Sequence, residues 1–166
     1  MTFAEDSRLR RVLLLMFFAL YFYRFGVTAL EGFFNYPFWR DMGPMMSNAD
    51  FIRLRADHVW KVFILLLGPA ILLVLVTLTL AIAPVRPLPR WVFAGAFACQ
   101  MAALISTFSV QLPIQRQLDT TGYDQAIIER LIETDLLFRK VPSVIEGVFV
   151  LLALWIVIRA AAVRPA

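Results

Sequence analysis

The stretch that decides the fold runs from Val62 to Ala83 and reads VFILLLGPAILLVLVTLTLAIA. It contains no charged residue. A helix that rises about 1.5 Å per residue needs about 20 apolar residues to cross the hydrocarbon layer of a bilayer. The stretch therefore predicts a transmembrane helix. Its Gly68-Pro69 pair predicts a kink rather than an end, because membrane helices tolerate these residues.

Three further apolar runs flank this one along the chain. The four predicted spans are about residues 12–36, 59–83, 91–112 and 136–158. Interfacial or extramembrane helices are expected at about 48–58 and 124–138, where capping residues precede patterned apolar positions. The sequence thus predicts an all-α fold, in which residues 1–166 form a single transmembrane domain, an integral membrane four-helix bundle.

The composition supports this fold class. Hydrophobic residues make up 61% of the 166 residues, and the mean hydropathy is +0.76. One soluble core of this size could not bury so much apolar surface. Sixteen Lys and Arg against 12 Asp and Glu give a net charge of +4, but these charges flank the apolar runs, where they meet lipid headgroups. No water-facing element carries a basic stripe with interleaved aromatics, so nucleic acid is not an expected partner.

Prolines mark the expected ends of helices. Pro37 is expected to end the first helix, because its ring lacks an N–H and disfavours helical geometry at the preceding residue. Pro113 follows the third span, and Pro142 interrupts the fourth. Segment 84–90 contains three prolines and predicts a short rigid turn, so spans two and three are expected to be antiparallel neighbours.

The basic residues near the span ends predict the orientation. The side that holds both termini and the 84–90 turn carries seven Lys or Arg, with Glu5 and Asp6 as its acids, whereas the other side carries eight basic residues mixed with eight acids. We therefore expect both termini in the cytoplasm. The first span could instead be a signal peptide cleaved near residues 27–29, but its many large aromatic residues favour a retained span.

Three polar residues share one face of the first helix. Arg24, Glu31 and Asn35 are spaced by seven and four residues. An unpaired ionisable group at membrane depth costs at least about 2.5 kcal/mol, so this face is expected to point into the bundle. Two interpretations are open. Glu31 either contacts Arg24 or reaches the headgroups in a structural role, or these residues line a pocket for a substrate, a proton or a cofactor.

Two more charged positions lie in or near the fourth span. Glu146 has no basic residue three or four positions later, so it is expected to be neutral, to reach the interface, or to pair with Arg24 or Lys61. Asp135 and Arg139 have the spacing and order of a stabilising ion pair on a helix surface. Arg139 is also expected to snorkel to the interface.

The third span carries several polar residues and is expected to face the bundle interior. These residues are Gln100, Ser106, Thr107, Ser109 and Gln111.

His58 and Cys99 are the only histidine and the only cysteine. His58 is expected to be a hydrogen-bonded or interfacial residue, or an acid or base if Glu31 or Asp135 approaches it. It cannot by itself form a two-histidine metal or haem site. Cys99 is expected to be a small buried thiol. No metal or cofactor is therefore expected.

Two groups of short motifs point to a family. They are NYPFW at 35–39 with Gly43, Phe51 and His58 downstream, and LPIQRQL at 112–118 with LIETD at 131–135 and Arg139 after it. Over about residues 30–158 the chain resembles small four-span bacterial membrane proteins of unknown function, within the anthrone-oxygenase-like superfamily. The resemblance implies four helices in a bacterial plasma (inner) membrane, with a substantial first loop and a helical third loop.

The chain departs from that family pattern at several positions. Leu54 and Arg55 stand where the family has a tyrosine and the first of two histidines, and Leu136 replaces a tryptophan. These departures weaken any metal or catalytic proposal carried over from the family.

Three functions remain open, and the sequence does not decide whether the chain is an enzyme. The first is binding or oxidation of a small lipophilic or aromatic molecule, such as a quinone-like one, within the helix bundle. Its candidate pocket residues are Arg24, Glu31, Asn35, His58 and Glu146. The second is a non-catalytic accessory or structural subunit of a larger membrane complex. The third is a small proton-coupled transporter, active as a homo-oligomer, with Glu31 and Glu146 titrating. The lipid bilayer is an expected partner in all three.

Overall fold

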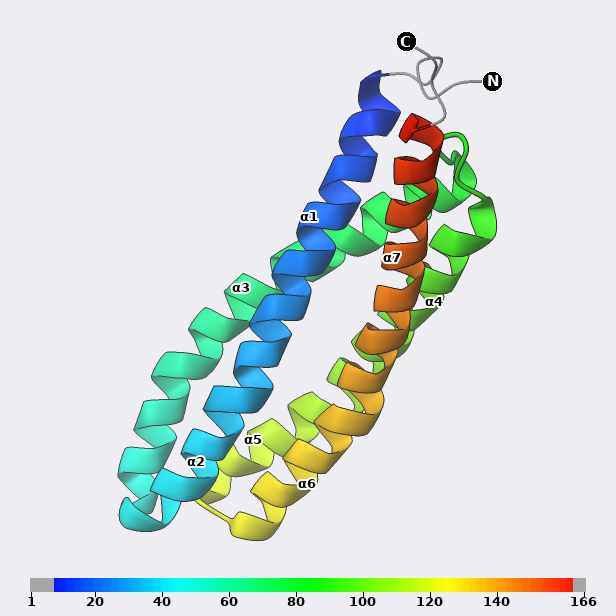
Figure 1. Ribbon diagram of the computed structural model, residues 1–166. Coiled ribbons are helices and arrows are strands. Elements are labelled where there is room, and N and C mark those ends of the chain that lie inside the picture. The colour runs from blue at the N-terminus through cyan, green and yellow to red at the C-terminus, as the bar shows by residue number, and fades with distance from the viewer. Residues whose placement is uncertain (1–7, 163–166) are drawn as a thin grey trace.

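The described part of the chain is helical apart from the short connections between the rods. A computed structural model describes residues 8–162, except for the side chains of residues 58–60, 62 and 63. Its helices join into four long rods that run up and down beside one another (Figure 1). Each rod is long and apolar enough to cross a membrane. The prediction of an all-α chain with four such segments is therefore confirmed.

Helices and short wide turns alternate within the rods. The first rod joins α1 (Arg8–Leu30), the π-helical turn η2 (Glu31–Asn35), α2 (Tyr36–Met42) and the 3-10 turn η3 (Gly43–Met45). The second rod is one helix, α3 (Asn48–Ile82). The third joins α4 (Arg90–Ser106), the π-helical turn η4 (Thr107–Gln111) and α5 (Leu112–Thr121). The fourth joins α6 (Gln125–Asp135), the π-helical turn η5 (Leu136–Lys140) and α7 (Val141–Ala162).

The prolines do not break these rods. Pro37 was expected to end the first helix and Pro142 to interrupt the fourth, but both lie inside continuous rods, as does Pro113. Each is the second residue after a π-helical turn, and the N–H just after that turn bonds to the carbonyl of the turn's first residue. This wider turn gives room to a ring that would otherwise clash with the carbonyl four residues earlier. Since each proline removes only one donor, the helix continues.

Two of the predicted helices merge with the spans that follow them. The hydroxyl of Ser47 caps α3 by accepting a hydrogen bond of 3.2 Å from the N–H three residues later, and α3 then runs unbroken through Pro69. The expected helix at 48–58 is thus the first part of α3. Asp124 caps α6 in the same way, at 3.1 Å, and the expected helix at 124–138 continues through η5 into α7.

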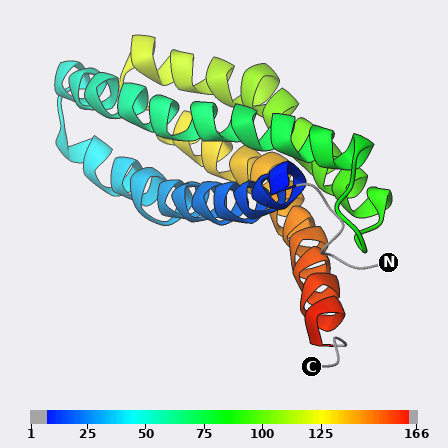
Figure 2. The same cartoon turned by 90° about the horizontal axis from the view of Figure 1, so that it is seen from above.

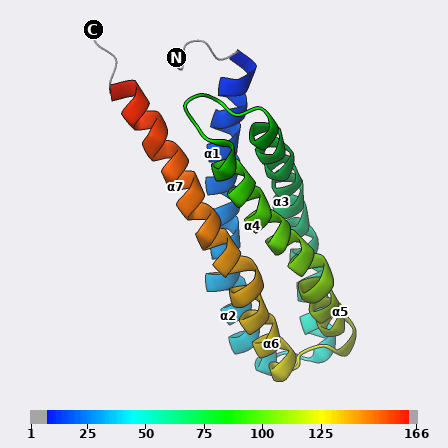
Figure 3. The ribbon, with the colours of Figure 1, turned by 90° about the vertical axis from the view of Figure 1, so that its right-hand side faces the viewer.

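The four rods form a closed ring of neighbours. α1 packs along α3, α3 along α4 and α4 along α7, and a shorter contact between α7 and α1 closes the ring. The described chain ends and the α3–α4 turn lie at one end of the bundle, and the α2–α3 and α5–α6 connections lie at the other (Figure 1). α7 diverges from α1 toward the C-terminal end (Figure 2, Figure 3).

Two apolar clusters fill the bundle, one toward each end. The cluster near the chain ends includes Phe17, Leu73, Phe93 and Val150. The cluster at the other end includes Tyr36, Phe51, Leu118 and Leu131. Between these positions along the rods lie buried polar residues, among them Arg24, Glu31, Gln100, Asp135, Arg139 and Glu146. The core therefore has a polar middle layer between two apolar ones, and this layer contains the candidate site.

Candidate functional site

A hydrogen-bonded network joins one residue from each rod. Arg24 of α1 forms an ion pair with Glu146 of α7. From α4, the Nε2 of Gln100 donates to Glu146 Oε1 at 2.7 Å and to Thr77 Oγ1 of α3 at 2.9 Å. Thr77 in turn donates to the carbonyl of Leu73 at 2.7 Å. These contacts satisfy a Glu146 carboxylate that is fully buried.

A second ionic cluster surrounds Arg139 at the η2 and η5 turns. Its Nη2 lies 2.9 Å from Glu31 Oε2, and its Nη1 lies 2.9 Å from Asp135 Oδ1 and donates to the Tyr36 hydroxyl at 3.3 Å. Lys140 also pairs with Asp135. The prediction that Arg139 snorkels to the interface is wrong, because its side chain is buried between two carboxylates inside the bundle.

Both clusters are built from the same local sequence. The pattern R-x3-[S/T]-x2-E-G occurs at residues 24–32, RFGVTALEG, and again at 139–147, RKVPSVIEG. The middle hydroxyl of each copy donates to the carbonyl of that copy's arginine at 2.7 Å, from Thr28 in one and from Ser143 in the other. Because α1 and α7 run antiparallel, equal spacing lets the arginine of each copy meet the glutamate of the other.

The structure gathers most of the residues predicted for the site. Arg24, Glu31 and Asn35 line one cavity, and Glu146 is connected to it through its ion pair with Arg24. Among the described residues, Arg24 and Glu31 form no ion pair with each other, since each pairs with the opposite rod. Glu146 pairs with Arg24, which is one of the two basic residues predicted as its partner, the other being Lys61. His58 belongs to α3, but its side chain lies outside the described part of the structure.

The third rod turns most of its polar residues inward. Gln100, Ser106 and Gln111 are buried, and Thr107 lines the cavity. Ser109 is exposed and donates to the backbone carbonyl four residues earlier at 2.8 Å. The third rod therefore supplies polar groups to the bundle interior, as expected from the sequence, with one exception.

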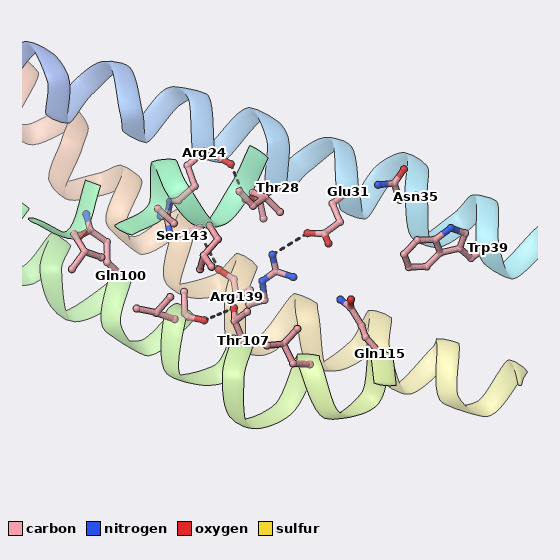
Figure 4. Close-up of a pocket in the computed structure, with 17 residues that line it drawn as sticks. Arg24, Thr28, Glu31, Asn35, Trp39, Gln100, Thr107, Gln115, Arg139 and Ser143 are labelled. Atoms are coloured by element: carbon pink, nitrogen blue, oxygen red, sulfur yellow. Dashed lines mark hydrogen bonds and ion pairs between the residues drawn. The ribbon is translucent and has the colours of Figure 1, made fainter. Parts of the chain in front are cut away.

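The cavity has a volume of about 110 Å³ and lies between all four rods (Figure 4). Its polar side chains come from the first, third and fourth rods, and α3 contributes only apolar side chains. The α3 residues are Leu66, Leu67, Ala70 and Val74. Figure 4 shows Arg139 pointing across the cavity toward Glu31, with Gln100 at the Arg24 end and Trp39 at the other.

Two buried polar atoms beside this cavity have no hydrogen-bond partner among the described residues. They are Nε of Arg24 and Oε1 of Gln100. An unsatisfied buried polar group costs about 1–3 kcal/mol, so such groups are normally paired with protein, water or a ligand. Arg24 and Gln100 both line the same end of the cavity (Figure 4), so a group bound there lies beside residues that have one unpartnered N–H donor and one unpartnered amide oxygen.

Arg55 is a buried charge whose role the sequence did not reveal. Its Nε donates to Asp119 Oδ1 at 3.0 Å, its Nη2 donates to the Gln115 carbonyl at 3.2 Å, and its guanidinium lies 4.4 Å from the ring centroid of Trp39. Gln115 and Trp39 line the cavity, so Arg55 positions that end of it. The spacing on α3 does not mark this role, because its ionic, hydrogen-bonding and closest aromatic partners belong to other rods, and only the Phe51 ring, 6.0 Å from the guanidinium, belongs to α3. For Thr28 and Ser143, by contrast, the repeated motif is a visible signal.

In the described part of the chain, no three His, Cys, Asp or Glu side chains are placed to hold a metal ion. No protein-family model, curated protein or solved structure matches the chain. The resemblance to the four-span bacterial family therefore stays a prediction, and function is inferred from the cavity and its surroundings.

Proposed function

We propose that the four rods cross a lipid bilayer and that the cavity between them binds a small lipophilic molecule that carries a hydroxyl group. The outward faces of the rods support the first part. They expose large apolar side chains, such as Leu15 at 69% and Phe33 at 75%. In water, contiguous apolar surface of this kind drives aggregation. In a bilayer the same apolar surface contacts apolar lipid tails. Helices also satisfy their own backbone polar groups there.

The end with the α3–α4 turn is proposed to face the cytoplasm of a bacterial plasma membrane. Among the described residues this end carries no acid and six exposed arginines, which are Arg8, Arg10, Arg11, Arg86, Arg90 and Arg159. Basic residues beside span ends favour the cytoplasmic side. The bacterial origin and the membership of the four-span family are part of the same proposal, and the resemblance of the sequence motifs supports them.

The observation that carries the ligand assignment is the pair of unpartnered atoms on Arg24 and Gln100. A hydroxyl oxygen can accept from the guanidinium N–H while its hydrogen is donated to the amide oxygen. The apolar α3 wall suits a ring or a short hydrocarbon. The cavity volume is of the same order as the engineered cavity of about 150 Å³ that holds benzene. A single-ring phenol has the hydroxyl group, the apolar ring and the small size that this cavity suits.

Phenol and toluene provide a matched pair of probes, because they are similar in size and differ in the hydroxyl. We expect the purified chain in lipid nanodiscs to bind phenol saturably in a calorimetric titration. Gln100→Leu removes the acceptor and is expected to weaken phenol binding about tenfold, the equivalent of one hydrogen bond. Toluene binding is expected to change little in the same variant, which shows that the cavity is intact. Gln117→Leu, at an exposed position of α5, is the control.

Phenol binding that is absent, or that Gln100→Leu leaves unchanged, would refute the ligand assignment. In that case the accessory-subunit and proton-coupled transporter functions would take its place. Oxidation of a bound aromatic molecule, which the family resemblance implies, is a separate prediction beyond binding.

A further inference from the structure

Two crossed ion pairs connect the first rod with the fourth. Arg24 pairs with Glu146, and Arg139 pairs with Glu31 at 2.9 Å. Both pairs come from the two copies of one motif, so each arginine also has a glutamate on its own rod, seven residues later. Each of the four charges thus has two possible partners, one across the seam between the rods and one on the same rod.

The same-rod partner lies on the same helix face, two turns away. Seven residues make two helical turns, about 10.5 Å along the axis and only about 20° around it, so the arginine and glutamate of one copy share a face. A long arginine side chain and a glutamate that lean toward each other can span this rise. If both arginines exchange partners together, no buried charge is left unpaired. This matters because an unpaired charge inside a bundle or a membrane is strongly unfavourable.

Some charged and polar neighbours of the four charges stay in place during such an exchange, and others cross the seam. Asp135 and Lys140, which surround Arg139, belong to the same rod as Arg139 and move with it. Gln100 donates to Glu146 from α4, which packs along α7. These contacts are therefore kept when α1 separates from α7. The hydrogen bonds from the Tyr21 hydroxyl to the Ser143 carbonyl (3.2 Å) and from Arg139 Nη1 to the Tyr36 hydroxyl (3.3 Å) cross the seam and are lost when it parts, as is the contact of Lys140 with the Tyr36 ring.

The packing makes the seam between α1 and α7 the weakest side of the ring. α1 packs along α3 and α7 packs along α4, whereas the contact between α1 and α7 is shorter, and α7 diverges from α1 (Figure 2, Figure 3). Gly32 and Gly147 follow the two glutamates, and a Cβ on either would overlap Lys140 or Tyr21 of the opposite rod. Pro37 and the π-helical turns remove regular backbone hydrogen bonds close to the motifs, where helices bend most easily.

We propose that the two crossed ion pairs, one between α1 and α7 and one between the adjoining η2 and η5 turns, are a latch on the seam between the first and fourth rods. When each arginine exchanges to the glutamate of its own rod, the seam is released and the cavity opens sideways to the bilayer. Arg24, Thr28 and Glu31 of one motif copy, and Arg139 and Ser143 of the other, line the cavity, so a parted seam exposes it. A lipophilic ligand enters from the hydrocarbon layer by this route. The ligand's entry route rests on the proposed function, whereas the exchange of ion-pair partners does not.

Two double variants with the same net charge test the latch in opposite directions. Arg24→Glu/Glu146→Arg keeps an opposite-charge pair across the seam but places like charges on each rod, so it is expected to hold the seam closed. Arg24→Glu/Glu31→Arg keeps an opposite-charge pair within the first rod but places like charges across the seam, so it is expected to open the seam. Both variants are made in a Cys99→Ser background.

The readout is a distance across the seam. Nitroxide labels at Leu30 of α1 and Val141 of α7, exposed by 57% and 45%, are measured by double electron–electron resonance in lipid nanodiscs. We expect a short and a long distance in the unswapped chain, and a shift of about tenfold in their ratio toward the short distance in the first variant and toward the long one in the second. A label pair at Leu30 and Ile64 of α3 is the control, and its distance is expected to stay constant.

The same two positions, changed to cysteine, allow cross-linking by a short bis-maleimide in native membranes before any extraction. The cross-linked fraction is expected to rise in the first double variant and to fall in the second. Equal distance distributions and equal cross-linking in both variants would overturn the latch. If Arg24→Glu/Glu31→Arg does not accumulate, the first variant alone decides, since it must remove the long-distance population. Phenol binding is measured separately, so a failed ligand assignment and a failed latch give different results.

Discussion

Replacing Glu146 by leucine would leave the guanidinium of Arg24 buried without its carboxylate. The Arg24 residue is 8% exposed and Glu146 is 0% exposed, so water can do little to solvate the remaining charge. Removal of one partner from a buried ion pair costs about 3–5 kcal/mol. The amide of Gln100 also loses an acceptor, but this loss overlaps with the first and does not simply add to it. We expect Glu146→Leu to lower the free energy of unfolding by about 3–5 kcal/mol.

The double variant Arg24→Met/Glu146→Leu removes both charges and fills their space with apolar side chains. Replacement of a whole buried ion pair by hydrophobic residues is often neutral or stabilising. Because Gln100 keeps only its bond to Thr77, we expect the double variant to remain within about 1 kcal/mol of the unsubstituted chain. The loss caused by the single substitution should therefore be almost fully recovered.

Unfolding by sodium dodecyl sulfate in dodecyl maltoside micelles, followed by circular dichroism, measures these free energies. The exposed ion pair between Arg40 and Asp41, at 2.9 Å, is the matched control. Arg40→Met/Asp41→Leu is expected to change the free energy by less than about 1 kcal/mol. Two results would refute this explanation. One is that Glu146→Leu lowers the free energy of unfolding by less than about 1 kcal/mol. The other is that the double variant lowers it by as much as Arg24→Met and Glu146→Leu do in sum.

Three further substitutions are tested by the same titration. Gly147→Ala places a Cβ 2.5 Å from a tyrosine hydroxyl of α1 and should lower the free energy of unfolding by about 1–3 kcal/mol. Its control, Gly68→Ala, meets no described atom within 4 Å and should be neutral or stabilising by up to about 1 kcal/mol. Equal effects of the two substitutions would contradict the close approach of α1 to α7. Arg55→Met should cost about 1–2 kcal/mol, because it removes the cation–π contact and an ion pair whose other member, Asp119, is 41% exposed and can be hydrated. A cost near zero would show that Arg55 does not position the cavity end.

The rods could be predicted from the sequence because their signal is local. A run such as Val62–Ala83 is apolar at every turn, whatever lies beside it, and it forms the second half of α3. The effect of prolines was harder to predict. In the sequence, Pro37 and Pro142 are typical of residues that end a helix. In the structure each follows a π-helical turn, and the loss of a single backbone donor leaves the rest of the helix intact.

The pairing of the buried charges could not be derived from spacing alone. Arg24 has Glu31 on its own face and Glu146 on another rod, and both are compatible with its sequence position. The choice depends on α1 packing antiparallel to the fourth rod at a particular height, which is a tertiary property. The equal spacing from Arg24 to Glu31 and from Arg139 to Glu146 is visible in the sequence, and together with the antiparallel arrangement it determines the crossed pairing.

The central claim is that lipid surrounds the apolar outer faces of the rods. A nitroxide at Val148 of α7, which is 62% exposed, tests it in proteoliposomes through its collisions with molecular oxygen, which concentrates in lipid, and with a water-soluble nickel chelate. We predict frequent collisions with oxygen and almost none with the chelate, in contrast to a label at the exposed Asn48. Collisions with the chelate as frequent at Val148 as at Asn48 would contradict the claim.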